Sequence, residues 1–219
     1  MKLQRLGGYA AIAFVCVTLI GLAFMFRLQR LGDLNDPIQA MTVISSSPVD
    51  FYFAYLLRLP LSILILITVL AINERMLADA PNLTRMATIA ASITAALGIL
   101  QTVTQVFTIE QIVPTNDVSA YGALDTIAKS MWAASGHTSG WISLLIGCAI
   151  LKTRKFQKTP ACLLILTGIF WIRLPIPLEL GRLAIIPSIS WCVSFLWLGI
   201  AMLRQTQQKP LSKGIGVSG

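Results

Sequence analysis

The chain has 219 residues, of which 56% are hydrophobic and only 12% are charged, and its mean hydropathy is +0.77. This composition excludes a soluble protein with one apolar core beneath a polar surface. The net charge of +8 could suit nucleic acid, but the Lys and Arg residues lie at the ends of apolar segments and form no dense basic run with interleaved aromatic residues. We therefore expect a membrane protein that binds no nucleic acid.

Continuous apolar segments predict the fold class. Unpaired backbone groups are costly in hydrocarbon, so a chain crosses it as helices or as a closed barrel, and continuous rather than alternating apolar runs indicate helices. Segments of about 20 residues match the bilayer thickness. Six such segments cover residues 8–26, 51–73, 86–109, 127–151, 160–176 and 185–203. We predict an all-α bundle of six transmembrane helices.

The first span, "GGYAAIAFVCVTLIGLAFMF", has an apolar run too long for a signal peptide and is predicted to be an uncleaved anchor. Residues 27–50 suit a short helix on the outer surface. The fifth span ends at "RLPIPLELG", where Pro175 and Pro177 cannot continue a helix, so a cap, a re-entrant turn or an interfacial hairpin is expected there. Residues 1–203 form one predicted domain, and the polar tail 204–219 is expected to be disordered.

The distribution of basic residues predicts the orientation. Eleven Lys and Arg residues fall on the N-terminal side of the membrane and five on the other side. Because basic residues accumulate on the cytoplasmic side, both termini are predicted to be cytoplasmic.

Polar residues within the spans predict a ligand site. An ionisable side chain in the membrane is costly and usually faces protein or water. With the predicted topology, several such residues share one depth in the outer half: Arg58, Gln101, His137, Arg173 and Glu179. We expect these residues to line a pocket for a small amphipathic or anionic ligand, such as a lipid. Structural roles stay open for each, including snorkelling to the interface for Arg173 and Glu179.

Small residues around the single histidine predict a close helix contact. Gly136, Gly140, Ser143 and Gly147 form a stripe on one face of the fourth span, and such a stripe lets another helix approach closely. The partner is a helix of the same chain or of a second copy in a homodimer. His137 is turned about 100° away from the stripe, toward Trp141.

Templates for catalysis and metal binding are missing from the sequence. It contains no HExxH, GxSxG or P-loop motif, and no span carries paired carboxylates. One histidine and four cysteines without CxxC spacing do not supply the usual ligand sets for a metal. We expect no catalytic residue, no metal site, no cofactor and no enzymatic activity.

The C-terminal half contains "SGWISLLIGCAILKTRKFQKTPACLLILTGIF" and then "SISWCVSFLWLGIAMLR", and the chain opens with "RLGGYAAI". These segments resemble a family of bacterial six-helix membrane proteins, domain of unknown function 4386. The resemblance spans nearly the whole chain and implies about six spans in the bacterial inner membrane. It implies no activity, cofactor or catalytic residue. Arg58 and the "RLPIPLELG" turn have no counterpart in the family pattern.

The expected function is therefore ligand or lipid binding by an integral membrane protein. Two alternatives stay open: a structural or assembly subunit of a membrane complex, indicated by the small-residue stripe, and a small-molecule transporter. The absence of an internal repeat and of carboxylates in the spans weakens the transporter alternative.

Overall fold

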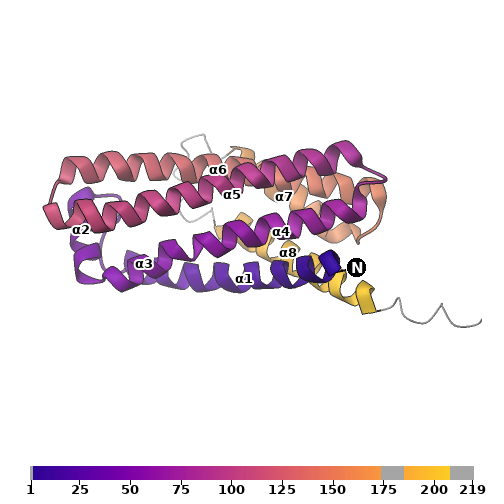
Figure 1. Cartoon of the computed structure of the whole chain (residues 1–219), viewed down its shortest axis with the longest axis horizontal. Coiled ribbons are helices and arrows are strands. Elements are labelled where there is room, and N and C mark those ends of the chain that lie inside the picture. The colour runs from indigo at the N-terminus through magenta and orange to yellow at the C-terminus, as the bar shows by residue number, and fades with distance from the viewer. Residues whose placement is uncertain (1, 174–184, 208–219) are drawn as a thin grey trace, which may run out of the picture.

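The computed structural model describes residues 2–173 and 185–207, and every regular element in these ranges is helical. The α-helices are α1 (Lys2–Gln29), α2 (Pro37–Ser46), α3 (Pro48–Leu56), α4 (Arg58–Met76), α5 (Pro81–Phe107), α6 (Val118–Thr153), α7 (Lys158–Arg173) and α8 (Ile185–Gln207). A π-helical turn (Thr108–Ile112) and a 3-10 turn (Val113–Thr115) continue α5 (Figure 1). The all-α prediction is confirmed for the described residues.

Four helical segments are long and apolar enough to cross a membrane: Lys2–Gln29, Pro48–Met76, Pro81–Thr115 and Val118–Thr153. The apolar parts of α7 and α8, Lys158–Ile172 and Ser188–Arg204, are shorter. The chain is thus a multi-pass membrane protein by the length and composition of its helices. Six spans and cytoplasmic termini stay predictions.

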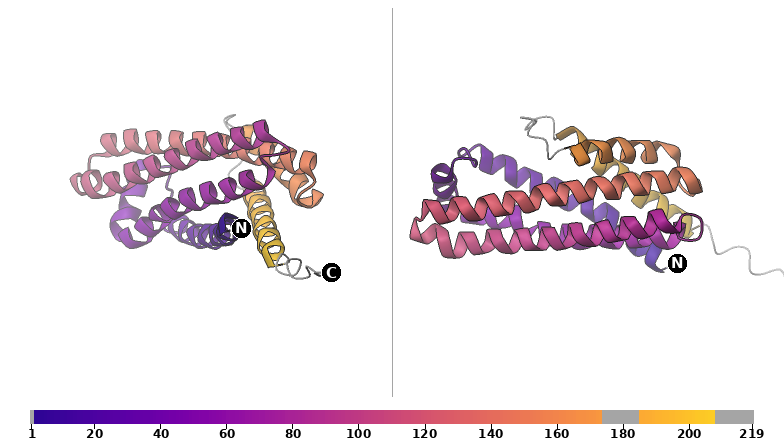
Figure 2. Two further views of the ribbon diagram at one scale, coloured as in Figure 1. Left: turned by 45° about the vertical axis from the view of Figure 1, so that its right-hand side comes forward. Right: turned by 90° about the horizontal axis from the view of Figure 1, so that it is seen from above.

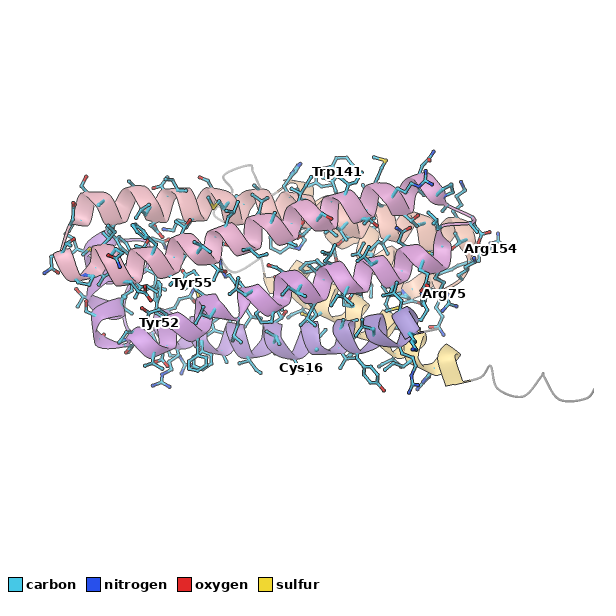
Figure 3. The ribbon with its side chains drawn as sticks, viewed as in Figure 1. Cys16, Tyr52, Tyr55, Arg75, Trp141 and Arg154 are labelled. Atoms are coloured by element: carbon cyan, nitrogen blue, oxygen red, sulfur yellow. The ribbon has the colours of Figure 1, made fainter. Side chains whose placement is uncertain are left out.

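The long helices run side by side along one axis (Figures 1 and 2). Helix α4 packs between α1 and α5, α6 packs between α5 and α7, and α8 contacts both α1 and α7. Helices α2 and α3 lie at one end of the bundle, which we call the α2 end (Figure 1). The N-terminus of α1 and the α4–α5 and α6–α7 turns lie at the opposite end, which we call the basic end because it carries Arg75 and Arg154 (Figure 3).

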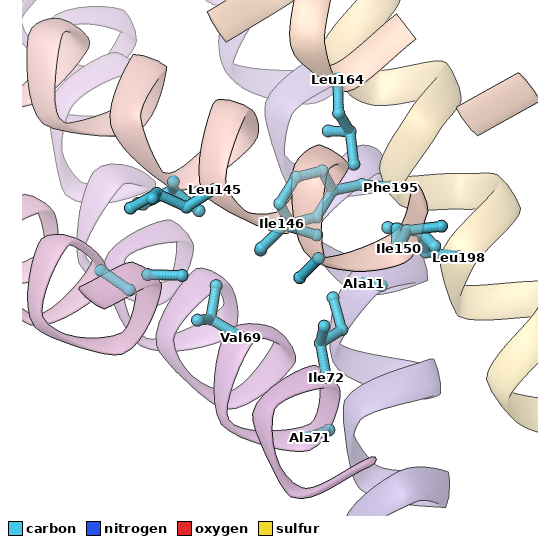
Figure 4. Packing of buried hydrophobic residues seen from close by; sticks show 14 of the residues in the cluster. Ala11, Val69, Ala71, Ile72, Leu145, Ile146, Ile150, Leu164, Phe195 and Leu198 are labelled. Carbon is cyan, nitrogen blue, oxygen red and sulfur yellow. The ribbon is translucent and has the colours of Figure 1, made fainter. Parts of the chain in front are cut away.

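Two apolar clusters hold the bundle together. The larger one joins α1, α4, α6, α7 and α8 through residues such as Ala11, Ile72, Ile146, Leu164 and Phe195, which are at most 1% exposed (Figure 4). The smaller one lies at the α2 end and joins α2 and α3 to α1, α6 and the turns after α5; its members include Leu28, Ile44, Phe51, Ile109 and Tyr121. The described bundle therefore has an apolar core in two parts.

The second predicted span is interrupted near its start. Helix α3 ends at Leu56 and α4 begins at Arg58, so Pro60 falls in the first turn of α4, where a missing N–H is tolerated. This break places Arg58 in the first turn of a new helix.

The fourth predicted span starts too late. Helix α6 begins at Val118, nine residues before residue 127, and its first turn is capped by the Asp117 side chain, which accepts a hydrogen bond from the Ala120 N–H. Its 36 residues measure about 54 Å at about 1.5 Å per residue, well beyond a hydrocarbon core of about 30 Å.

The predicted surface helix in residues 27–50 corresponds to α2, which Asp36 caps by accepting from the Ile38 N–H. Helix α8 continues to Gln207, past the predicted domain boundary at residue 203. Most of the "RLPIPLELG" turn and residues 208–219 of the predicted tail lie outside the described residues.

Candidate ligand-binding site

Arg58 is a half-buried cation without a counter-charge among the described residues. Its guanidinium carbon lies 4.7 Å from the centre of the Tyr55 ring. Its Nη1 nitrogen is buried and has no hydrogen-bond partner, and none of the ion pairs in the described part of the chain includes Arg58. A buried charged donor with no acceptor is strongly unfavourable, so the guanidinium calls for an acceptor that these residues do not supply.

Contacts between α4 and α5 fix the level of Arg58 along the bundle. The Ser62 hydroxyl donates to the Arg58 carbonyl oxygen over 2.9 Å, and the same hydroxyl lies where a Cβ on Gly98 would be. Four residues further along α5, the Thr102 hydroxyl lies 3.4 Å from the carbonyl oxygen of Tyr55. Arg58 in α4 is therefore level with Thr102 in α5.

Two buried amides lie at or near this level, Gln101 beside Thr102 and Gln105 one turn closer to the α2 end. Gln101 and Gln105 are one helical turn apart on α5 and are only 4% and 3% exposed. No hydrogen bond to either side-chain amide is found within residues 2–173 and 185–207. Neither amide belongs to the buried groups that lack a partner, so the amide atoms keep some accessible surface and can bond to a molecule outside the chain. We call Tyr55, Arg58, Gln101, Thr102 and Gln105 the Arg58 layer.

An acidic residue borders this layer from α6. The Asp125 carboxylate is close enough to the hydroxyls of Tyr55 and Tyr121 to act on both electrostatically. It pairs with Lys129, one turn along α6, over 2.7 Å. The Asp125 charge is therefore already compensated by Lys129, and Arg58 keeps no ionic partner among the described residues.

An apolar groove opens beside the Arg58 layer. It encloses about 390 Å³ and is lined by Leu56, Leu59, Thr102, Val103, Val106, Phe107, Glu110 and Gln111. We call it the α4–α5 groove. Thr102 belongs to both the groove and the layer, so the two are adjacent. At the α2 end of the groove, the Glu110 carboxylate accepts from the Tyr52 hydroxyl over 3.3 Å.

His137 lies away from the Arg58 layer. The hydroxyls of Thr94 and Thr138, which are 2.7 Å apart, fix the register of α5 against α6. In this antiparallel register the level of Thr102 corresponds to residue 130, so His137 lies seven residues, or about 10 Å, closer to the basic end. Figure 3 likewise places Trp141 farther along the bundle than Tyr55. The structure therefore brings Gln101 to the level of Arg58 but does not bring His137 there.

The contact found for the His137 side chain is a local one within α6. Its Nε2 accepts a hydrogen bond from the Trp141 Nε1–H over 3.2 Å, and the two residues are one turn apart on α6. Trp141 is 41% exposed, whereas His137 is half-buried and its Nδ1 is buried without a hydrogen-bond partner among the described residues. Of the two other predicted pocket residues, Arg173 ends α7, and its side chain and Glu179 lie outside the described residues.

The small-residue stripe packs against α7 of the same chain. A Cβ on Gly140 would lie 2.9 Å from the Ile172 nitrogen, and one on Gly147 would lie 2.8 Å from the Ala161 carbonyl oxygen. A Cβ on Gly136 would lie 3.1 Å from the Trp171 ring, and Ser143 is fully buried, with its hydroxyl donating to the Ser139 carbonyl oxygen. The feature that indicated a partner protein is thus accounted for by α7.

Tyr55, which contacts Arg58, and two residues near Tyr55 were missed in the sequence. Tyr55 precedes Arg58 by three residues, a spacing that places two side chains on one helix face, and this signal was available. Tyr121 and Asp125 share a face of α6 by the same rule, but they lie before the predicted start of that span.

Comparison with known proteins gives no match to this chain. No family model, no curated protein and no solved structure matches it. The resemblance to the family of bacterial six-helix membrane proteins therefore stays a prediction.

Proposed function

We propose that this membrane protein binds a small anionic or amphipathic ligand at the Arg58 layer. The observation that carries the proposal is the buried Nη1 nitrogen of Arg58, which has no partner among the described residues. An anionic oxygen beside it would form a charge-assisted hydrogen bond, roughly twice as strong as a neutral one. The ligand would thereby supply the acceptor that the chain lacks.

The rest of the layer supports an anion better than a cation. The Gln101 and Gln105 amides each offer two N–H donors, and the Tyr55 hydroxyl offers one more. All three side chains are buried, at 9% exposure or less. Because Asp125 is paired with Lys129, it leaves the charge of Arg58 uncompensated. We propose binding rather than a reaction, without a cofactor, since the layer contains one cation and neutral hydrogen-bonding side chains and carries no acid, base or nucleophile in a catalytic arrangement.

The proposal includes an orientation. The excess of basic residues at the end opposite α2 favours a cytoplasmic basic end, and with six crossings both termini would lie inside. The Arg58 layer would then lie in the outer half of the membrane. Seventeen residues of α4 separate Arg58 from Arg75 at the basic end, or about 25 Å, which is most of a hydrocarbon core of about 30 Å.

Native mass spectrometry of the protein purified in mild detergent tests the proposal. Wild-type protein should retain an anionic molecule, and Arg58→Gln should reduce its occupancy about tenfold or more, since hydrogen bonds to charged groups contribute about 1.5–3 kcal/mol. The matched control is Arg30→Gln, which removes an exposed charge at the same end of the bundle. Equal retention by the Arg58 and Arg30 variants would exclude the proposed site.

His137→Ala provides a second control. Because His137 lies about two helical turns from the Arg58 layer, its removal should leave the retained molecule in place. A loss equal to that of Arg58→Gln would mean that the ligand extends across both levels, which contradicts a site confined to the layer.

A further inference from the structure

We propose that the α4–α5 groove binds a zwitterionic phospholipid with a primary-amine head group, its ammonium at Glu110 and the upper part of one acyl chain between α4 and α5. This second site goes beyond the proposed function, because it does not use Arg58. Its basis is that Glu110, a carboxylate without an ion-pair partner among the described residues, lies at the α2 end of an apolar groove.

The groove runs from the head-group level of the membrane toward its centre. Arg85 at the basic end and Glu110 are 25 residues apart on α5 and the turn that continues it, or about 37 Å at about 1.5 Å per residue. A membrane measures about 30 Å across its hydrocarbon and about 40–45 Å with the head groups, so both charged residues fall in head-group layers. Thr102, near the other end of the groove, lies about 12 Å closer to the centre than Glu110. A lipid with its head group at Glu110 therefore points its acyl chain inward, whichever way the protein is oriented.

The walls of the groove suit hydrocarbon. Five of its eight lining residues are Leu, Val or Phe, and its volume of about 390 Å³ falls in the range of about 300–1,000 Å³ typical of small-molecule sites. Leu56, Val103 and Phe107 are 41%, 58% and 49% exposed. The groove therefore opens sideways from helices that are apolar enough to span a membrane, so lipid reaches it directly.

Polar side chains gather at the α2 end of the groove. Glu110 and Gln111 both line it, both are exposed, and both belong to the π-helical turn Thr108–Ile112. The Glu110 carboxylate accepts the Tyr52 hydroxyl over 3.3 Å, and tyrosine is enriched at the level of lipid head groups. A primary ammonium offers three N–H donors to the carboxylate, and the Gln111 amide offers two to a phosphate. The polar end of the groove thus matches both charges of the head group.

The charge at the groove selects this head group over others. Of the residues that the structure describes, no Lys, Arg or His lines the groove, so an anionic head group would meet Glu110 without a compensating cation. A choline head group is cationic but has no N–H, so it forms no charge-assisted hydrogen bond with the carboxylate. A soluble amine would pair with Glu110 but would leave the apolar walls without an occupant.

The test uses delipidated full-length protein in nonionic detergent, with binding measured by native mass spectrometry. The probes are the dioleoyl forms of phosphatidylethanolamine, phosphatidylcholine and phosphatidylglycerol, and short-chain dihexanoyl phosphatidylethanolamine. Glu110→Gln removes the charge but keeps an acceptor for Tyr52, and Val106→Trp fills the groove at a half-buried lining position. The matched controls lie outside the groove: Asp33→Asn changes an exposed carboxylate at the α2 end, and Ile93→Trp enlarges a side chain that is 46% exposed on α5.

The expected result is preferential binding of dioleoyl phosphatidylethanolamine. Glu110→Gln should weaken it about fivefold, to the level of dioleoyl phosphatidylcholine, and Val106→Trp should weaken it about tenfold or more. Asp33→Asn and Ile93→Trp should leave it unchanged. Arg58→Gln should also leave it unchanged, so this inference and the proposed function fail separately.

Several results would overturn the inference. Equal binding of phosphatidylcholine, tighter binding of phosphatidylglycerol or an unchanged affinity in Glu110→Gln would exclude the pair between ammonium and carboxylate. Dihexanoyl phosphatidylethanolamine bound as tightly as the dioleoyl form, with no effect of Val106→Trp, would exclude an acyl chain in the groove. A loss in Arg58→Gln as large as in Glu110→Gln would place the head group at the Arg58 layer instead of at Glu110.

Discussion

Gly140 of α6 and Gly168 of α7 pack backbone against backbone. A Cβ on Gly168 would lie 2.7 Å from the Gly140 carbonyl oxygen, and one on Gly140 would lie 3.0 Å from the Gly168 carbonyl oxygen. Contacts this short do not occur between real Cβ atoms and backbone, so neither position accepts a side chain without moving a helix. In membranes, where apolar burial does not drive helices together, such close backbone approach is a main source of helix association.

Gly168→Ala should therefore destabilise the bundle. The added methyl group meets the Gly140 carbonyl and the Leu144 nitrogen at 2.7 and 2.8 Å, and backbone atoms cannot swing aside as a flexible side chain can. We expect a loss of about 1–3 kcal/mol, as for other overpacked positions, measured by thermal unfolding in detergent. Gly21→Ala is the control, because its nearest neighbour, Leu57, would be 4.0 Å away. Similar unfolding temperatures for the two variants would contradict the close backbone contact between Gly140 and Gly168.

Arg75→Ala should loosen the basic end. The Arg75 guanidinium donates to the Lys155 carbonyl oxygen over 3.1 Å and lies 4.4 Å from the centre of the Phe156 ring. Lys155 in turn donates to the Arg75 carbonyl oxygen over 3.0 Å and pairs with Asp79. Because these contacts join the α4–α5 and α6–α7 turns, we expect a loss of about 1–3 kcal/mol in thermal unfolding.

Limited trypsin digestion locates this effect. Cleavage after Arg154, next to the joined turn, should become faster in Arg75→Ala than in the wild type. Arg85→Ala removes an exposed basic side chain near the same end and should change stability by less than about 0.5 kcal/mol. Unchanged cleavage after Arg154 in both variants would show that the joined turns do not protect this site.

Apolar runs predicted where helices occur but not where they begin. Helix α6 starts among polar residues, and its start is set by the Asp117 cap rather than by hydropathy. The span was therefore predicted to begin nine residues late, and depths counted from that start placed His137 level with Arg58. The depth of a residue depends on how its helix is aligned with the neighbouring helices. The hydrogen bond between Thr94 and Thr138 sets the alignment of α5 with α6, and the sequence of either helix alone does not predict it.

Only part of the candidate site could be predicted from the sequence. Arg58 and Gln101 are conspicuous because charged and amide side chains are rare in apolar spans. Tyr121 and Asp125, on the α2 side of this level, could not be placed near Tyr55 without knowing that α6 extends toward the α2 end. The small-residue stripe indicated a close-packing face, but spacing alone does not tell which helix covers it, and the partner glycine lies in α7.

The hydrogen bond between Thr94 and Thr138 should appear as a coupling energy. In a double-mutant cycle with Thr94→Val and Thr138→Val, we expect a coupling of about 0.6 kcal/mol, the average for such contacts in membrane proteins. The Thr104 hydroxyl bonds only to Leu100 of its own helix, so Thr104→Val should show no coupling to Thr138→Val. A zero value for the first pair would mean that the two hydroxyls do not bond across the helices.

Labelling of cysteines introduced at the two ends tests the orientation. Ser119→Cys places a thiol at an exposed position in the first turn of α6, at the α2 end, and Lys152→Cys places one at the basic end. In a background without the four native cysteines, a membrane-impermeant maleimide should label residue 119 in intact cells and residue 152 only after permeabilisation. This outcome follows from the basic excess at the end that carries Arg75 and Arg154, because basic residues are retained on the cytoplasmic side. The reverse pattern would place the Arg58 layer in the inner half of the membrane, and an anionic ligand would then reach it from the cytoplasmic leaflet.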